Sequence, residues 1–323
     1  MRRRDFILAS WATIAWPLSA RAQEPGRIYR LGDLHLSPRN AAHNAAIFDA
    51  VKVDGFIDGQ NLIVDDHGFG LRVNELADHA SAIVKANVDL IFCAGEPAVR
   101  AAQQATKTIP ILGLADDMVR SGFVSSLAKP GGNTTGVSIL ATELDGKRQE
   151  ILLEAVPGIR RIAALADANG TLPQELKALQ ETAHARGVDL SIYRVAKADE
   201  IAGAIDAAKS SGAAALNVLA GTLLYNNRRI ILPRVAALGL PAIYQFPTMA
   251  EEGGLMGYGT SLEEIYRNIL ARQLVKLLRG ANPADVPVEQ PSKYELVVNL
   301  KAARSLGLTI PESVLLRAEK VIE

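Results

Sequence analysis

Residues 88–115 of the chain read VDLIFCAGEPAVRAAQQATKTIPILGLA. The apolar runs at 88–93 and 109–114 have the length and the continuous hydrophobicity of buried strands. Between them, residues 97–105 begin with proline, which suits the first turn of a helix, and continue with alanine-rich sequence of high helix propensity. Strand, helix and strand in this order predict a right-handed βαβ unit within a parallel sheet that is covered on both faces.

The alternation of strand and helix extends on both sides of this unit and restarts after residue 160. Toward the N-terminus we expect strands at 28–34 and 61–65 and helices at 40–53 and 72–86. The second series, strands and helices in alternation, occupies residues 161–166, 173–186, 189–195, 197–210, 213–219, 227–238 and 241–244. The pattern predicts an α/β fold of two doubly wound parallel-sheet lobes.

The junctions between the two series predict how the lobes are connected. The glycine pairs 131–132 and 253–254 each precede a short strand and a longer helix, and a proline-containing stretch at 280–291 leads to a final strand and helix. A chain that builds one lobe, builds the second, returns and crosses again indicates a multi-strand hinge. We expect lobe 1 to comprise residues 27–138 plus 262–288, and lobe 2 to comprise residues 139–261 plus 289–323.

The first 22 residues have the pattern of an export signal peptide. Three arginines at 2–4 precede a mostly apolar run at 6–18, and Ala20-Arg21-Ala22 matches a small-x-small cleavage site. The apolar run is shorter than the ~20 residues that a membrane-spanning helix needs. Because Arg3-Arg4-Asp5-Phe6-Ile7 also resembles a twin-arginine signal, both Sec and Tat export remain open. We expect cleavage after Ala22 and a periplasmic protein.

Charge and motif content exclude several classes of function. The 35 basic and 35 acidic residues leave no net charge, which argues against nucleic acid as a partner. A single cysteine, Cys93, allows neither an intrachain disulfide nor a cysteine metal cluster. The sequence contains no HExxH, GxSxG, GxGxxG or P-loop pattern. We therefore expect no metal, no cofactor and no enzymatic activity.

Several long stretches of the chain resemble a known family. They are 127–138 (LAKPGGNTTGVS), 147–152 (KRQEIL, matching at all positions but Gln149), 242–244 (AIY), 253–259 (GGLMGYG), 280–291 (GANPADVPVEQP) and 294–300 (YELVVNL). Over about residues 27–323 the chain resembles ABC-transporter substrate-binding proteins of the family that includes tryptophan-binding lipoproteins. The resemblance implies a type I periplasmic-binding-protein clamshell with three hinge crossings. The lipobox cysteine of some relatives is absent, which implies a free periplasmic protein.

The resemblance also implies a function and partners. Such a protein captures a small molecule between its lobes, here an amino acid or a small aromatic or carboxylate-type solute, and delivers it to an ABC permease in the inner membrane. We expect a monomer. The main alternative is a periplasmic sensing module that presents its ligand to a receptor, which the sequence does not distinguish from a transport protein. A repressor would need a DNA-binding segment where the export signal lies.

The binding site is expected in the loops that follow the strands, because ligands bind beyond the carboxyl ends of open parallel sheets. Helix N-termini at Pro97 and Thr171 offer N–H groups to a carboxylate, and Asp116 suits an ammonium group. Tyr244 and Phe246 offer flat apolar surfaces. The full predicted set is His35, Gly95, Glu96, Pro97, Asp116, Asn169, Thr171, Gly221, Tyr244 and Phe246.

Glu96 departs from the family pattern, because relatives often carry serine or threonine before the proline of this loop. A carboxylate at this position repels an anionic ligand. Two interpretations therefore stay open. Either the ligand is not a simple carboxylate, or Glu96 points away from the site and complements the dipole of the following helix.

Overall fold

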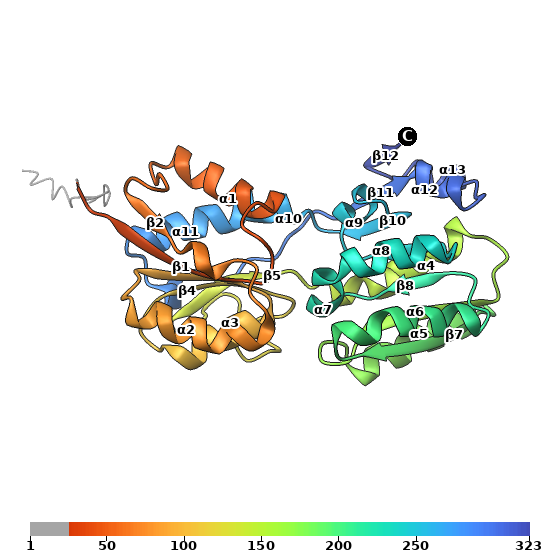
Figure 1. The fold of residues 1–323 in the computed structure, drawn as a ribbon, viewed down its shortest axis with the longest axis horizontal. Coiled ribbons are helices and arrows are strands. Elements are labelled where there is room, and N and C mark those ends of the chain that lie inside the picture. Colours follow the sequence, from red (N-terminus) through yellow and green to blue (C-terminus); the bar gives the residue numbers. More distant parts are fainter. Residues whose placement is uncertain (1–25) are drawn as a thin grey trace, which may run out of the picture.

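The computed structural model describes residues 26–323, so the expected signal peptide at 1–22 lies outside the described residues. Figure 1 shows two α/β lobes that lie side by side along the long axis of the molecule and are joined at its centre. Each lobe is built on its own, mostly parallel sheet with helices on both faces. The predicted fold class is confirmed.

Lobe 1 contains a five-stranded parallel sheet in the order β2-β1-β3-β4-β5. Its strands are β1 (Tyr29–His35), β2 (Leu62–Val64), β3 (Leu90–Ala94), β4 (Ile111–Ala115) and β5 (Thr134–Ser138). Its helices are α1 (Ala42–Val53), α2 (Leu76–Lys85) and α3 (Glu96–Ala105), with short 3₁₀ turns η1 (Asp66–Gly68) and η2 (Val73–Glu75).

The chain returns to lobe 1 after building lobe 2. It does so through α10 (Leu262–Glu264), the π-helical segment η4 (Ile265–Leu270), α11 (Ala271–Leu278) and η5 (Pro283–Asp285). This returning helical stretch packs against α1, although more than 200 residues separate the two in sequence. Sequence periodicity predicts the helix but not its interruption by a π-helical segment, a feature that often marks a functional position.

Alternation along the central strand of lobe 1 fills both faces of the sheet. Leu90 and Phe92 of β3 belong to the core that α1 and α11 cover, whereas Ile91 and Cys93 belong to the core beneath α2 and α3. All four side chains are fully buried. Because each face of β3 packs into a hydrophobic core, the sequence of this strand is a continuous apolar run and does not alternate with polar residues.

Lobe 2 contains a seven-stranded sheet in the order β12-β11-β10-β9-β8-β6-β7. Its strands are β6 (Arg161–Asp167), β7 (Asp189–Val195), β8 (Leu216–Val218), β9 (Ala242–Tyr244), β10 (Met256–Gly259), β11 (Glu295–Asn299) and β12 (Lys320–Ile322). Its helices are η3 (Thr142–Leu144), α4 (Asp145–Ala155), α5 (Pro173–Ala185), α6 (Ala198–Ser210), α7 (Thr222–Asn226), α8 (Arg228–Ala237), α9 (Pro247–Glu251), α12 (Leu300–Ser305) and α13 (Glu312–Leu315).

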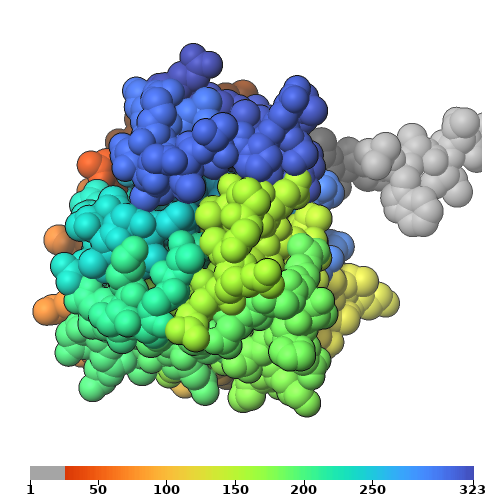
Figure 2. Space-filling view, turned by 90° about the vertical axis from the view of Figure 1, so that its right-hand side faces the viewer, coloured from red at the N-terminus to blue at the C-terminus, as the bar shows by residue number. Residues whose placement is uncertain are grey.

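Two strands of lobe 2, β11 and β12, run opposite to the other five and so differ from the expected all-parallel arrangement. β11 is antiparallel to β10 and parallel to β12. The reason is the direction in which the chain re-enters the lobe, because it arrives from the hinge, at the edge where β10 ends. Figure 2 views this end of the molecule and shows the C-terminal segment (blue) packed directly against the rest of lobe 2.

The chain crosses between the lobes at 139–141, 260–261 and 286–294. The first and third crossings lie beside each other, because the backbone nitrogen of Ser138 donates to the carbonyl of Glu289 over 2.9 Å. The buried guanidinium of Arg148 joins the first crossing to the end of β10, just before the second crossing, by donating to the carbonyls of Ala141 and Tyr258. Within residues 26–323, no helix combines the length and the hydrophobicity that crossing a membrane requires.

Candidate ligand-binding site

A cavity of about 820 Å³ lies between the lobes. Lobe 1 contributes the loops that follow β1, β3 and β4, and lobe 2 contributes the loops that follow β6, β7, β8 and β9. Because parallel strands end at one edge of each sheet, the two edges face each other across the cavity. The volume is within the range of pockets that enclose a small organic molecule.

The structure brings most of the predicted site residues together in this cavity. Seven of them line it, namely Gly95, Glu96, Pro97, Asp116, Asn169, Gly221 and Phe246. The other three, His35, Thr171 and Tyr244, do not line it. The rule that ligands bind at strand ends therefore located the cavity, and the errors concern the direction of individual side chains.

The sequence interpretation is corrected for these three residues. His35 is fully buried in lobe 1, stacked on Phe69 with ring centroids 5.1 Å apart. Tyr244 is 1% exposed and belongs to the core beneath α6 and α8 rather than to the cavity wall. Thr171 is 3% exposed, in the turn where its backbone nitrogen donates to the carbonyl of Asp167 over 2.9 Å.

Three aromatic side chains line the cavity, and they come from both lobes. Tyr225 and Phe246 of lobe 2 meet edge to face with centroids 5.0 Å apart. Tyr266 of lobe 1 is carried by the π-helical segment. We call these three rings the aromatic wall. They offer the flat apolar surface on which a ring or an aliphatic group packs.

His43 of α1, which is not among the predicted site residues, also lines the cavity. Its Nε2 lies 3.1 Å from Oγ of Ser37, and its ring meets that of Tyr266 edge to face at 4.8 Å. Burial lowers the pKa of the His43 imidazole to about 4, and the guanidinium of Arg228 acts in the same direction. Burial raises the pKa of Tyr225 to about 12. Both rings are therefore neutral at neutral pH.

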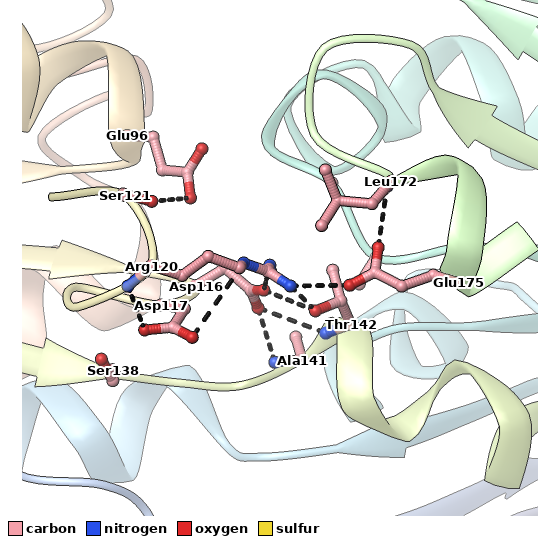
Figure 3. A network of polar contacts seen from close by, with 12 residues as sticks. Glu96, Asp116, Asp117, Arg120, Ser121, Ser138, Ala141, Thr142, Leu172 and Glu175 are labelled. Carbon is pink, nitrogen blue, oxygen red and sulfur yellow. Dashed lines mark hydrogen bonds and ion pairs between the residues drawn. The ribbon is translucent and has the colours of Figure 1, made fainter.

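Glu96 is the first residue of α3 and faces the cavity. Its Oε1 accepts a hydrogen bond from Oγ of Ser121 over 2.9 Å, and Figure 3 shows the carboxylate at the edge of the gap between the lobes. Burial raises the pKa of this carboxyl above its usual value. The structure therefore places Glu96 on the cavity wall, against the interpretation in which its side chain points away from the site.

Asp116 lies at the hinge as well as on the cavity wall. Its carboxylate accepts hydrogen bonds from the backbone nitrogen of Ala141 over 2.6 Å and from Oγ1 of Thr142 over 2.7 Å. The backbone nitrogen of Thr142 and the guanidinium of Arg120 add two further contacts, both at 3.2 Å. Four donors therefore occupy the carboxylate that the sequence suggested for an ammonium group, and they make Asp116 a cap for the first hinge crossing.

On the lobe 2 side of the cavity, the polar side chains of Asp167 and Gln245 are held in place by hydrogen bonds within the lobe. The Asp167 carboxylate accepts from the backbone nitrogens of Asn169 and Leu223 over 3.0 and 3.2 Å. The Gln245 amide donates to and accepts from the backbone of Gly221, with both distances at 3.1 Å. These contacts fix the loops after β6, β8 and β9 relative to one another, so this half of the site is preorganised.

Two close approaches between the lobes lie beside the cavity. Arg120 of lobe 1 donates to Glu175 of lobe 2 over 2.6 Å (Figure 3). At the second place, a Cβ atom built on Gly95 would lie 3.1 Å from Cγ2 of Thr222. Gly95 has a φ of +93°, a conformation that favours glycine. The conformation described here is therefore one in which the lobes are in contact.

The described residues offer little for a metal ion or for covalent chemistry. Within residues 26–323, no group of three or more His, Cys, Asp or Glu side chains is arranged to hold a metal. The Cys93 thiol is buried, and desolvation raises its pKa above the usual value. The guanidinium of Arg228, another lobe 2 cation, is engaged by both carboxylate oxygens of Glu252, at 2.6 and 3.1 Å.

Sequence reasoning missed several lining residues for two reasons. Gln245 follows β9 directly and Thr222 is the first residue of α7, after the loop that follows β8, so the rule about strand ends reaches both loops, but Gly221 and Phe246 were chosen from them for the predicted set. Tyr266 and His43 lie on helices and not in the loops that directly follow the strands, although the Tyr266 ring is only 5.7 Å from that of Phe92 in β3. Only the packing of the returning helix against α1 brings those two rings together.

Comparison with known proteins gives consistent matches. Residues 38–322 match the family described as ABC transporter substrate binding protein. The tyrosine-binding protein of Clostridioides difficile (strain R20291) is 26% identical over 267 residues, which cover 80% of this chain and 74% of that protein.

Solved structures match over nearly the whole described chain. A conserved domain protein from Vibrio cholerae has a TM-score of 0.81 at 24% identity, covering 91% of this chain and 100% of its own. An ABC domain from Streptococcus pneumonia, solved in complex with L-Trp, has a TM-score of 0.79 at 25% identity with the same coverage. These matches confirm the resemblance that the sequence motifs suggested.

Proposed function

The chain belongs to the family of ABC transporter substrate-binding proteins, and from this premise we propose that it captures a small organic solute between its lobes and delivers it to a membrane permease. The observation that carries the proposal is the cavity of about 820 Å³ at the facing strand ends of two lobes. A solute held there contacts residues of both lobes at once, so its binding energy favours the form in which the lobes touch.

The lining supports a solute with an aromatic or aliphatic body. The aromatic wall of Tyr225, Phe246 and Tyr266 supplies apolar surface from both lobes. Relatives of the chain include a tyrosine-binding protein and a structure in complex with L-Trp. We propose an amino acid or a small aromatic solute of similar size as the ligand.

The proposed mechanism is a shift of population between open and closed lobes. Contacts such as Arg120 with Glu175 give the closed form some stability of its own, and the solute adds contacts that exist only when both walls are close. The permease then recognises the closed form. This mechanism needs binding and hinge motion but no covalent step, which fits the expectation of a non-enzymatic protein.

We further propose that the protein acts outside the cytoplasmic membrane as a monomer. The support for the location is the export signal expected at residues 1–22, with cleavage after Ala22. We also propose that the protein has no nucleic-acid partner, and the support is the balance of 35 basic against 35 acidic residues. Size-exclusion chromatography tests the monomeric state, and fractionation of cells that express the full chain tests the location.

A thermal-shift screen of the chain lacking residues 1–22 tests the proposed function. The screen covers amino acids, aromatic carboxylates, amines, short peptides and sugars, on protein refolded from denaturant so that no ligand from expression is retained. A solute at 1,000 times its dissociation constant stabilises by ~4 kcal/mol, which moves the midpoint by several degrees. Stabilisation by one chemical class supports solute binding, and no stabilisation by any class contradicts it.

A further inference from the structure

We propose that Glu96 is the specificity-determining residue of this cavity and that it selects a solute whose apolar body carries a positively charged nitrogen. The inference rests on the proposed function and names the substrate class of the same site. It predicts that an ammonium group sits at the start of α3 while the apolar body lies against the aromatic wall.

The first step of the argument is the position of Glu96. Its carboxylate lines the cavity and its single hydrogen bond to a described residue comes from the neutral hydroxyl of Ser121, at 2.9 Å. Among residues 26–323, no lysine, arginine or histidine nitrogen lies within ion-pair distance of it. A half-buried carboxylate with only one neutral partner retains acceptor capacity that a cationic donor satisfies well.

The nearest arginines do not neutralise this carboxylate. Arg120 contacts Asp116, Asp117 and Glu175, so one guanidinium is shared among three acids. Arg100, one turn further along α3, lies over the ring of Phe123 at 5.0 Å. The charged side chains that line the whole cavity are balanced, with Glu96, Asp116 and Asp167 against Arg72, Arg100 and Lys197. The preference for a cation therefore comes from the position of Glu96, whose carboxylate has no cationic partner within ion-pair distance among the described residues.

The start of α3 is already complemented by an acid. Glu96 occupies the first turn, and the N–H groups of Ala98 and Val99 both donate to the carbonyl of Gly95. Residue 97 is proline and has no N–H to offer. A solute carboxylate placed at this helix end would meet few free donors and one fixed negative charge, so the position discriminates against anions.

A pH dependence follows from the same groups. Burial raises the pKa of Glu96, and Asp116 acts in the same direction, whereas Ser121, Arg120 and Arg100 act in the opposite direction. A bound ammonium favours the ionised carboxylate and lowers this pKa. Affinity for an amine therefore increases as the pH rises through the pKa that Glu96 has in the free protein, provided that the amine itself stays protonated.

Two probes with the same ring and chain length test the inference directly. Tyramine and 3-(4-hydroxyphenyl)propionate differ in that one ends in an ammonium group and the other in a carboxylate. Titration calorimetry at pH 7 gives a dissociation constant for each with the wild-type chain and with Glu96→Gln. We expect tyramine to bind at least tenfold more tightly than the acid, and we expect Glu96→Gln to reduce this ratio at least tenfold.

Two control variants separate recognition from a structural role. Ser121→Ala removes the hydrogen bond to Glu96 but keeps its charge, and should keep the preference for tyramine. Glu181→Gln removes an exposed carboxylate on α5 and should change neither dissociation constant. If Glu96 served only to stabilise α3, Glu96→Gln would lower the thermal midpoint and leave the ratio of the two dissociation constants unchanged.

Several results would overturn the inference. One is an acid probe that binds within threefold of tyramine, and another is a ratio that Glu96→Gln does not change. A third is failure of both probes to bind while another solute of the broad screen stabilises the chain, which rejects the amine class but leaves the proposed function standing. Absence of stabilisation by every solute in that screen would instead reject the proposed function itself.

Discussion

Arg120 in the loop after β4 and Glu175 near the start of α5 form an ion pair of 2.6 Å that joins the two lobes beside the cavity (Figure 3). The same guanidinium contacts Asp116, which caps the first hinge crossing through Ala141 and Thr142. Lobe contact and hinge geometry are therefore connected through one side chain. The pair forms only when the lobes are close, so it contributes to the balance between open and closed forms.

Removing this ion pair should open the unliganded protein. Glu175→Gln keeps the hydrogen bond that this position accepts from the backbone nitrogen of Leu172, because glutamine also completes a capping box. A partly exposed ion pair contributes about 0.2–1 kcal/mol, so the closed-to-open ratio should fall by up to about fivefold. Small-angle scattering of the ligand-free chain should show a larger radius of gyration, whereas the surface control Glu181→Gln should not. An unchanged radius in Glu175→Gln would show that the pair does not bias closure.

Gly95→Ala should weaken ligand binding through two separable effects. An L-residue at φ +93° and ψ +145° is strained by roughly 1–3 kcal/mol, and the new Cβ would lie 3.1 Å from Cγ2 of Thr222. Thr222→Ser removes that methyl group and keeps the hydroxyl. We expect Gly95→Ala to lower both the thermal midpoint and the affinity, and the double variant to recover part of the affinity but not the midpoint. Equal affinity of the single and double variants would show that contact across the cavity is unimportant.

Regular elements with strong periodicity were predictable from the sequence, because their burial leaves a local trace. The strand at 189–195 has the predicted bounds, and α5 and α6 differ from prediction by one residue each. The cavity was also predictable, because parallel strands place their carboxyl ends, and the loops that follow, at one edge of the sheet. Seven of the ten predicted residues line the cavity for this reason.

Side-chain direction and long-range pairing were not predictable in the same way. β9 spans only three residues and all are buried, so nothing in the sequence says that Tyr244 points into the core and that Phe246, two residues on, reaches the cavity. Tyr266 and His43 meet only because the returning helix packs on α1. The burial of Arg148 with Asp145 likewise depends on the hinge crossings, which lie more than 100 residues apart in sequence.

The buried pair of Arg148 and Asp145 should be essential for the stability of the hinge. Arg148 is 0% exposed and donates to Asp145 over 2.7 Å, and Asp145 also accepts from the backbone nitrogen of Ala220 over 3.0 Å. Removing one partner leaves the other charge buried without compensation, which costs about 3–5 kcal/mol. In urea unfolding at pH 7, Arg148→Met and Asp145→Asn should each lower the free energy of unfolding by about this amount. Lys147→Met, one residue away and exposed, should stay within about 0.5 kcal/mol of wild type.

The two variants of this pair should respond differently to pH. Burial raises the pKa of Asp145, and without Arg148 the carboxyl takes up a proton more readily. When an acid has a higher pKa in the folded chain than in the unfolded chain, stability decreases as the pH rises above the pKa of the unfolded chain. Arg148→Met should therefore be less destabilised at pH 5 than at pH 7. Asp145→Asn should show no such relief, because an arginine does not lose its proton in this range. Equal relief in both variants would contradict this account.

Two buried histidines of lobe 1 should make the protein sensitive to mild acid. Desolvation lowers the pKa of His35 to about 3 and that of His43 to about 4, so both are neutral in the folded chain. Unfolded histidine takes up a proton near pH 6.5. The contribution of each neutral ring to the free energy of unfolding is therefore fully present above that pH, and it is lost as the pH falls toward the pKa of the folded state. Each ring should account for about 2 kcal/mol between pH 7.5 and pH 5.

Urea unfolding of His35→Leu at these two pH values isolates one of these contributions. Leucine should pack against Phe69 and Phe92 where the imidazole lies now, and the stability difference between pH 7.5 and pH 5 should shrink by about 2 kcal/mol. Burial raises the pKa of the neighbouring Asp33, which changes stability with pH in the opposite sense. Because its carboxyl lies 3.5 Å from the His35 ring, the comparison is repeated in the Asp33→Asn background, where that contribution is absent. His184→Gln, exposed on α5, should leave the difference as in wild type. If His35→Leu also leaves the stability difference between pH 7.5 and pH 5 unchanged, the His35 ring is not held neutral by the fold.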